Sequence, residues 1–251
     1  PAMQDHEGGR IEELGANLVH MDYMVPYFAG IPESPDDYRA SFSDLTSGFA
    51  ERWKGDIWLA PDGTRFVNED ESDEDIRETA LQDVEDTRVV IVFDQGIVDA
   101  NDGVIPVRGF EERLEAGYAV KQADTLEALA AAFELPISAV NETVGTINEA
   151  AESGEPEPQF GRETNIAFGT PPYYGILCYG VTFMTQGGVD TNAEMEVLDE
   201  NGDVVPGLYA AGEVQGTAQW SGHCYAGGAG NAPAIIFGME AGRNATAYAK
   251  Q

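Results

Sequence analysis

A glycine-rich segment in the last tenth of the chain contains the residue types best suited to chemistry. Residues 225–232 read Tyr-Ala-Gly-Gly-Ala-Gly-Asn-Ala and lead directly into an apolar stretch. A loop that opens into a helix presents unpaired backbone N–H groups at the positive end of the helix dipole. Its glycines let a planar ligand approach the backbone closely, so the segment could bind an anion or stabilise a developing negative charge. A tight turn into an ordinary helix would explain the same pattern without a ligand.

Other kinds of chemistry are weakly indicated. The loop lacks the Walker lysine, and no G-x-G-x-x-G fingerprint occurs in the 251 residues. Two cysteines, Cys178 and Cys224, are too few for a disulfide framework, and three histidines without a Cys-x-x-C pair predict no metal site. His223 could act as an acid or base because imidazole titrates near neutral pH, but a lone loop histidine is more often incidental.

The elements that must position the loop can be read from the local pattern. Residues 206–213 form a short apolar strand that ends in Gly-Glu, and an apolar helix follows the loop through Ile235, Phe237 and Met239. Before that strand, residues 193–198 predict another strand, joined through a turn at 199–203.

The earlier part of the chain has a mixed α and β pattern. Its predicted elements are a helix containing Ile11 and Leu14, a hairpin of strands 56–60 and 65–67, a buried strand at 89–93, a helix from Asp124 or Thr125 to Phe133, and a helix from Ser138 with apolar Val140, Val144 and Ile147. Nothing in this part alone indicates a particular reaction.

Three blocks of sequence occur in order along the chain. Residues 62–69, within the block 55–69, read Asp-Gly-Thr-Arg-Phe-Val-Asn-Glu, residues 186–189 read Gln-Gly-Gly-Val, and residues 206–213 read Pro-Gly-Leu-Tyr-Ala-Ala-Gly-Glu. The chain thereby resembles the FAD-dependent fumarate reductase and 3-ketosteroid dehydrogenase flavoproteins. The blocks are similar to that family's cap-domain hairpin, its re-entry into the flavin domain and its flavin-binding end. The resemblance implies FAD as the cofactor of the full-length protein.

The resemblance also implies an α+β fold in which a cap (substrate) domain is inserted in a partial α/β FAD-binding domain. Residues 1–26 would end the first FAD-domain segment, residues 27–168 would form the cap, and residues 169–251 would be the C-terminal FAD-domain segment. The half with the dinucleotide fingerprint would lie outside this chain. We therefore expect these residues alone to bind FAD weakly or not at all, and to expose an apolar surface that favours self-association.

Three positions match the family's cofactor-binding residues. The resemblance implies that Glu213 accepts hydrogen bonds from the ribityl hydroxyls of FAD. It also implies that Gly230 and Asn231 bring backbone N–H groups to the pyrimidine edge of the flavin. The dipole of the following helix would then favour the anionic reduced flavin.

The catalytic residue that the resemblance implies is Tyr225, whose hydroxyl would polarise a substrate ketone together with the Ala229 N–H. A packed aromatic side chain is the plainer interpretation of Tyr225. Family members that reduce dicarboxylates clamp them with histidines and arginines and use a cap arginine as proton donor. At the corresponding positions this chain has Tyr27, Met184, Tyr225 and Asp73. Tyrosine and methionine do not replace bidentate arginine, so fumarate reduction is disfavoured.

With Tyr27 and Met184 as substrate-binding residues, the pocket would suit a bulky apolar or aromatic enone. The predicted function is thus an FAD-dependent oxidoreductase that reduces or desaturates a carbon–carbon bond next to a carbonyl. Two alternatives stay open: a fumarate- or urocanate-type reductase of a small unsaturated acid, and a stand-alone acidic binding module derived from the cap. The sequence leaves open the direction of reaction, the electron donor and the general base.

Composition restricts the partners. The chain has 13 basic and 45 acidic residues, a formal net charge of -32, which repels nucleic-acid phosphates and anionic membrane surfaces. It contains no apolar run of the ~20 residues that cross a bilayer. A small-molecule substrate is the partner we expect. Both the cytoplasm and the cell envelope remain open as compartments.

Overall fold

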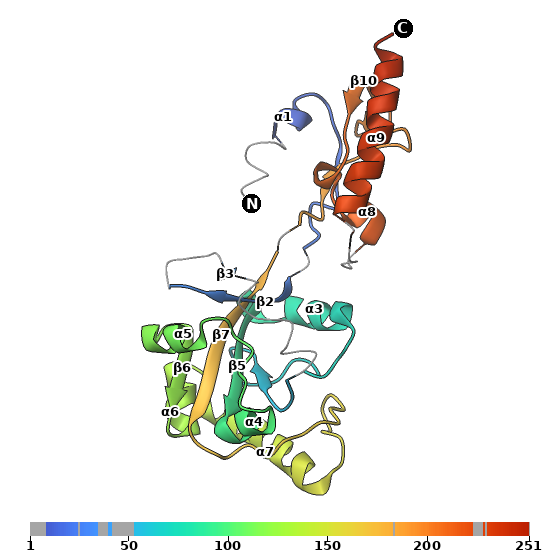
Figure 1. Cartoon of the computed structure of the whole chain (residues 1–251). Coiled ribbons are helices and arrows are strands. Elements are labelled where there is room, and N and C mark those ends of the chain that lie inside the picture. The colour runs from blue at the N-terminus through green and yellow to red at the C-terminus, as the bar shows by residue number, and fades with distance from the viewer. Residues whose placement is uncertain are drawn as a thin grey trace. The chain divides into compact units, whose positions relative to one another are not determined.

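The computed structural model describes residues 9–24, 26–34, 40–41, 53–182, 184–222, 228 and 230–250. The chain forms two compact units (Figure 1). Unit 1 comprises residues 1–25 and 182–251, and unit 2 comprises the continuous segment 26–181. Unit 2 is therefore an insertion within the sequence of unit 1.

Unit 2 is built on an antiparallel sheet. Its elements are β2 (Tyr27–Pro32), β3 (Ala40–Ser41), β4 (Ile57–Leu59), α3 (Glu74–Gln82), the 3₁₀ turn η3 (Glu85–Thr87), β5 (Arg88–Asp94), α4 (Gln95–Ala100), α5 (Phe110–Ala116), β6 (Val120–Ala123), α6 (Leu126–Ala132), α7 (Ile137–Ser153) and β7 (Tyr173–Val181). The strand order is β3-β2-β7-β5-β4, and β6 also pairs with β7. The long strand β7 is therefore the centre of the sheet.

The strand β5 shows why this sheet forms. It pairs with β7 along its whole length, from Arg88 opposite Tyr179 to Asp94 opposite Tyr173. Its five apolar residues 89–93 are all buried. A strand covered on both faces needs such a continuous apolar run, so the predicted buried strand is confirmed.

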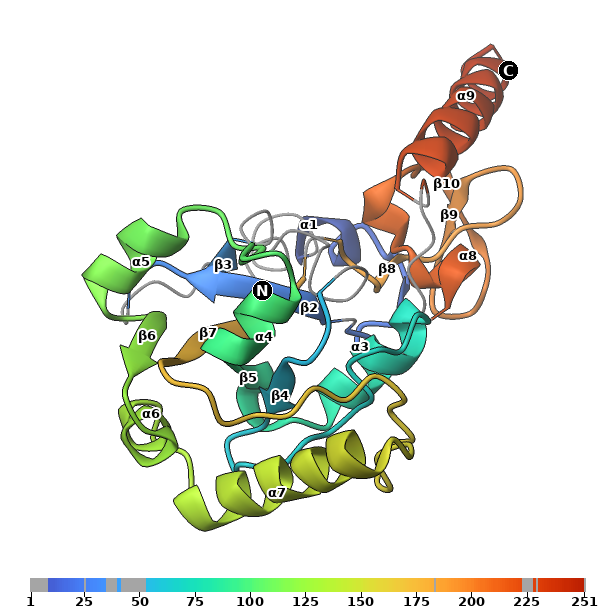
Figure 2. The same ribbon diagram turned by 60° about the horizontal axis from the view of Figure 1, so that its bottom comes forward.

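The helices of unit 2 form where the sequence provides a capping residue and regularly spaced apolar residues. Thr125 caps α6 by accepting a hydrogen bond from Ala128 N. In α7, the long helix of unit 2 in Figure 2, Val140, Val144 and Ile147 are buried, as their spacing predicts.

The predicted hairpin at residues 56–67 is only partly present. Arg65 makes one bridge to Leu59, and no second strand continues from it. Instead β4 pairs with β5, opposite residues 90–92. Beyond the bridge the chain is held by hydrogen bonds between the side chains of Arg65 and Glu69 rather than by a backbone ladder.

Unit 1 contains short elements and one long helix. These are α1 (Gly9–Glu12), β1 (Leu18–Val19), β8 (Gly188–Val189), β9 (Glu196–Leu198), β10 (Val204–Tyr209), the 3₁₀ turn η4 (Glu213–Gln215), α8 (Ala218–Ser221) and α9 (Asn231–Tyr248). β1 pairs with β8, and β9 pairs with β10. Its small core contains Ala16, Val189, Val197 and Ala210. The long helix α9 lies beside β10 (Figure 1) and buries none of its described side chains.

The expected domain boundaries differ from those of the compact units by one residue at the first boundary and by the length of a strand at the second. The sequence divided the chain after residues 26 and 168, whereas the units divide it after Val25 and Val181. The difference is mainly β7, which belongs to unit 2 because it pairs with β2, β5 and β6. The mixed α+β class is confirmed by the elements of both units.

In the part of the chain that the structure describes, no helix combines the length and the apolar character needed to span a membrane.

Candidate functional site

The candidate site in unit 1 is organised around the turn at Glu213. The backbone N–H of Thr185 donates to Glu213 Oε1 at 3.0 Å, and the Thr185 hydroxyl donates to the Glu213 carbonyl at 3.2 Å. The backbone N–H groups of Thr217 and Ala218 donate in turn to the carbonyls of Thr185 and Gln186. The segments 184–189 and 212–218 are therefore joined by hydrogen bonds at Glu213 and again at Thr217 and Ala218.

Two glycines allow these segments to come into contact. A Cβ atom on Gly188 would overlap the backbone of Gln215 and Gly216, and one on Gly216 would overlap the backbone of Gln186 and Gly187. Real Cβ atoms do not approach backbone atoms so closely. Gly188 of the 186–189 block therefore has a packing reason, which is to seat this loop directly against the Glu213 turn, whereas a Cβ on Gly187 would overlap the backbone of His20 and Met21.

The start of α9 lies at the same place. The Cβ position of Gly212 is 3.4 Å from Ala234 Cβ, within the first turn of α9, and that of Gly230 is 3.5 Å from the sulfur of Met184. Gly230 is the N-cap of α9 and makes no side-chain capping bond. In the first turn of this 18-residue helix, Pro233 has no N–H and the Ala232 N–H donates to the Gly228 carbonyl, so the Asn231 N–H is the donor that the helix start can offer to an anion.

The structure thus brings together four of the residues predicted from the sequence. Met184, Glu213, Gly230 and Asn231 come from three separate stretches of unit 1 and meet around the start of α9. The predicted residues Tyr225 and Ala229, and with them His223, lie outside the described residues. Their roles stay predictions.

The two cap residues of the prediction lie in unit 2. Tyr27 begins β2 opposite Val181 and is buried. Asp73 is the N-cap of α3, where its carboxylate accepts from Asp75 N at 3.0 Å. An exposed capping carboxylate is a plain structural role for Asp73.

Sequence reasoning missed two buried glutamines of unit 1. Gln215 is in η4, where Nε2 donates to the Thr191 hydroxyl at 2.6 Å and Oε1 accepts from Gly212 N at 3.2 Å. It therefore fixes the turn on which Glu213 sits. Gln186 is 3% exposed, and neither its Nε2 nor its Oε1 has a hydrogen-bond partner. Its only sequence signal was its position in the 186–189 block.

A network of buried charges holds the 62–69 block in unit 2. Arg65 binds Glu69 through two nitrogens and Glu157 at 2.6 Å, and Arg162 Nη1 lies 3.2 Å from Glu69. Burial alone would raise the pKa of Glu157, but hydrogen bonds from Arg65 and from two backbone N–H groups outweigh it and lower that pKa. These ion pairs are fully enclosed, so removing one partner would leave a buried charge unpaired.

Asp56 lies at the edge of this network. Burial raises the pKa of Asp56 to about 7, although Arg162 and a hydrogen bond from Trp58 partly oppose the shift. Trp58 Nε1 donates to Asp56 Oδ2 at 2.7 Å, and Arg162 donates to the Asp56 carbonyl at 2.6 Å. Asp56 is a fixed structural group whose charge changes near neutral pH.

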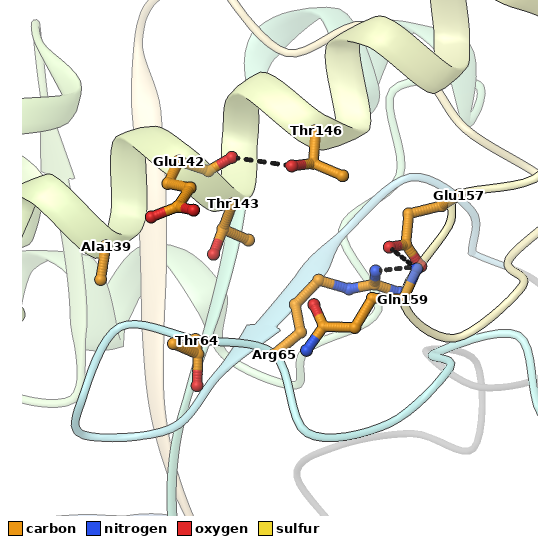
Figure 3. Close-up of a pocket in the computed structure, with 8 residues that line it drawn as sticks. All are labelled: Thr64, Arg65, Ala139, Glu142, Thr143, Thr146, Glu157 and Gln159. Atoms are coloured by element: carbon orange, nitrogen blue, oxygen red, sulfur yellow. Dashed lines mark hydrogen bonds and ion pairs between the residues drawn. The ribbon is translucent and has the colours of Figure 1, made fainter.

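A surface pocket of about 330 Å³ lies between the Thr64 turn and α7 (Figure 3). It is lined by Thr64, Arg65, Ala139, Glu142, Thr143, Thr146, Glu157 and Gln159. The cation on its wall, Arg65, is directed at Glu157 and is already neutralised, and the Thr143 hydroxyl donates to the Gly63 carbonyl. The pocket offers a ligand no unpaired positive charge, because its other charged wall residue, Glu142, is an exposed carboxylate, and no residue predicted for the site lines it.

Among the residues that the structure describes, no three His, Cys, Asp or Glu side chains are grouped so that they could hold a metal ion. Cys178 is a free, buried thiol, and burial raises its pKa, which makes it a poor nucleophile.

Comparison of the sequence with models of known protein families shows which family the chain belongs to. The family model of the FAD binding domain matches residues 16–232. The chain belongs to this FAD-binding family. Membership implies FAD as the cofactor of the full-length protein.

Three relatives indicate the range of this FAD-binding family. A protein named as a probable fumarate reductase from Shewanella frigidimarina is 28% identical over 95% of this chain and 37% of its own length. The vinyl phenol reductase of Lactiplantibacillus plantarum is 29% identical over 91% of this chain and 50% of its own length. The 3-oxosteroid 1-dehydrogenase of Mycobacterium tuberculosis is 34% identical over 59% of this chain and 29% of its own length. The chain spans half or less of these relatives.

Solved structures support the same fold. The open conformation of a flavocytochrome c3 fumarate reductase matches 96% of this chain and 39% of that chain, with 28% identity and a TM-score of 0.64. The 3-ketosteroid delta1-dehydrogenase of Sterolibacterium denitrificans matches 94% of this chain and 45% of that chain, with 23% identity and a TM-score of 0.70.

The described residues of unit 1 fit part of an FAD site. The Asn231 N–H at the start of α9, a carboxylate at Glu213 and a buried amide without a partner are the donor and acceptor types that a flavin and its ribityl chain require.

Proposed function

We propose that this chain forms the cap and the C-terminal flavin-domain segment of an FAD-dependent oxidoreductase that reduces or desaturates a carbon–carbon bond next to a carbonyl. Its substrate is a bulky apolar or aromatic enone. The observation that carries the proposal is the meeting of Met184, Glu213 and the start of α9 in unit 1, within a chain of the FAD-binding family.

When bound, FAD supplies the redox chemistry by exchanging a hydride equivalent with the substrate. The residues of this chain bind FAD and polarise the carbonyl group of the substrate. Glu213 accepts hydrogen bonds from the ribityl hydroxyls, and Gly230 and Asn231 present N–H groups to the flavin edge. The positive end of α9 stabilises negative charge at that edge.

The Tyr225 hydroxyl and the Ala229 N–H hold the carbonyl oxygen of the substrate. Donors aimed at this oxygen stabilise the enolate-like charge that develops there, which acidifies the neighbouring C–H. Met184 provides apolar surface for the rest of the substrate. The same residues serve reduction and desaturation, because the two directions share one transition state.

The absence of a carboxylate clamp at the described positions favours an enone over a small diacid. Met184 and Tyr27 stand where dicarboxylate-reducing members have polar clamp residues, and Asp73 adds a negative charge rather than the guanidinium of a proton donor. An anionic substrate gains nothing from such groups. A small unsaturated acid such as fumarate or urocanate is the second candidate, favoured by the fumarate reductase relative that aligns over 95% of the chain.

The full-length natural protein, loaded with FAD, tests the proposal. Dithionite-reduced viologen supplies electrons, and its oxidation is followed with a 3-ketosteroid enone, a hydroxystyrene, fumarate and urocanate. We expect turnover of the enone, and no turnover of the two acids or of the hydroxystyrene, which has no carbonyl next to its double bond. Rapid turnover of fumarate would overturn the substrate assignment, and a full-length protein that binds no flavin would overturn the function itself.

A further inference from the structure

Gln186 is a buried amide that no group in the structure satisfies. Its side chain is 3% exposed, and neither Nε2 nor Oε1 has a hydrogen-bond partner. Native proteins pair the great majority of their buried side-chain polar atoms. An amide left unpaired at both ends therefore indicates a partner that binds from outside the described residues.

The position of Gln186 shows which partner it would meet. Its carbonyl accepts from Ala218 N, and its neighbour Thr185 binds both the carboxylate and the carbonyl of Glu213. Two residues before it, the sulfur of Met184 lies against Gly230 at the start of α9. Gln186 is therefore part of the cluster of residues that the proposed function assigns to FAD binding.

Gln215 shows that residues in this part of unit 1 can provide hydrogen-bond partners for a buried side-chain amide. It is buried to the same degree, at 2% exposed, and lies in the segment that packs on Gly188. Both ends of its amide are nevertheless bonded, to Thr191 and to Gly212. The unpaired state of Gln186 is thus a property of one side chain and not of loose packing around it.

We propose that the Gln186 side chain is a cofactor-binding residue that hydrogen-bonds the polar edge of the isoalloxazine ring of FAD. An amide offers one donor and one acceptor side by side. The pyrimidine half of isoalloxazine presents alternating carbonyl and N–H groups, which are complementary to that pair. The inference rests on the proposed function, since it requires that the full-length protein holds FAD.

The test compares two matched variants of the full-length protein, Gln186→Met and Gln215→Met. Methionine keeps the length of the side chain and removes both hydrogen-bonding ends. FAD affinity is measured by flavin fluorescence, the flavin environment by the visible spectrum and the reduction potential, and folding by the melting temperature of the FAD-free protein.

For Gln186→Met we expect about three- to tenfold weaker FAD binding, the effect of one ordinary hydrogen bond. We also expect a changed flavin spectrum or potential, and a melting temperature of the FAD-free protein that is equal or higher. The last result follows because the substitution removes an unsatisfied group. Gln215→Met should lower the melting temperature of the FAD-free protein, because it breaks bonds that exist without the cofactor.

Two outcomes would overturn the inference while leaving the proposed function intact. One is a Gln186→Met protein whose FAD affinity, spectrum and potential all equal those of the wild type, as expected if water or another protein segment satisfies the amide. The other is a fall in the melting temperature of the FAD-free protein as large as that of Gln215→Met, which would show a structural role. A wild-type protein without bound flavin would instead refute the proposed function.

Discussion

At the scale of single residues, the proposed reaction depends most on the Tyr225 hydroxyl. Tyr225→Phe removes one of two donors to the substrate carbonyl, so we expect kcat to fall about 10²- to 10³-fold with a small change in KM. Steady-state rates with the accepted enone measure this. Tyr248→Phe, at an exposed position of α9, is the matched control and should leave the rate unchanged. Equal rates for Tyr225→Phe and wild type would remove Tyr225 from the mechanism.

The buried carboxyl of Asp56 gives a pH-dependent stability. Its pKa is raised from 3.8 to about 7, so between these values the folded state binds a proton that the unfolded state has released. Raising the pH through this window therefore lowers the free energy of unfolding, by up to about 1.4 kcal/mol per pH unit for one proton.

Asp56→Asn should abolish this part of the dependence, because an amide does not titrate and its oxygen can still accept from Trp58 Nε1. Urea unfolding of both proteins at pH 4.5, 6 and 7.5 measures the difference. The wild type should lose stability relative to the variant as pH rises. A constant difference across the three pH values would contradict the assigned pKa.

The residue types in the sequence predicted part of the candidate site, but they did not predict the buried amides beside it. The carboxylate at Glu213 and the glycine at Gly230 were visible because they stand in a recognisable order beside an apolar helix. The unpaired amide of Gln186 and the bonded amide of Gln215 were not visible, because hydrogen-bond satisfaction depends on segments about 30 residues apart in the chain. Tyr225 and Ala229 stay predictions because they lie outside the described residues.

At the scale of elements, we expect substitution by alanine to change the unfolding free energy in opposite directions at two glycines. Gly188→Ala would place a Cβ inside the backbone of the Gln215–Gly216 turn, and backbone cannot move aside as a side chain can. We expect a loss of about 1–3 kcal/mol in unfolding free energy, or more, together with weaker FAD binding.

Gly145→Ala is the matched control. Gly145 lies inside α7, no atom outside the backbone of its own helix lies within 4 Å of its Cβ position, and alanine is the better helix former. It should raise the unfolding free energy by about 0.5–1 kcal/mol. Chemical denaturation of the two variants checks both signs, and a neutral Gly188→Ala would show that the loop and the turn are not in contact.

Local elements were predictable where the sequence alone decides them. The buried strand at residues 89–93 and the helix capped by Thr125 follow from composition and capping, and both are confirmed. The strand expected from residue 193 begins only at Glu196, because the Asn192 side chain accepts from Glu194 N and Glu196 N and forms a turn there. The central place of β7 was not predictable, since it depends on pairing with β5, about 85 residues earlier.

At the scale of the whole molecule, α9 exposes large apolar side chains. Ile235, Ile236 and Met239 are 65%, 61% and 57% exposed. Apolar side chains gathered on one helix favour association. The 251 residues expressed alone should therefore show a molecular mass that rises with concentration in sedimentation or light scattering.

The double variant Ile235→Gln and Ile236→Gln should reduce this association, because it removes apolar surface without changing the net charge. Ala247→Gln, on an exposed position of the same helix, is the control and should associate as the unchanged chain does. A strictly monomeric unchanged chain would show that self-repulsion from its net charge of -32 outweighs the apolar surface.

The pairing of Tyr27 with Val181 has a consequence for how such proteins can diversify. The first strand and the last strand of unit 2 are hydrogen-bonded neighbours, so the segment leaves and rejoins the surrounding chain through backbone positions about 5 Å apart. A different segment with similarly adjacent ends could be transplanted there without lengthening either connection. If unit 2 is the cap of the proposed function, substrate choice could then change by exchange of one continuous stretch of gene, while the sequence on both flanks stays as it is.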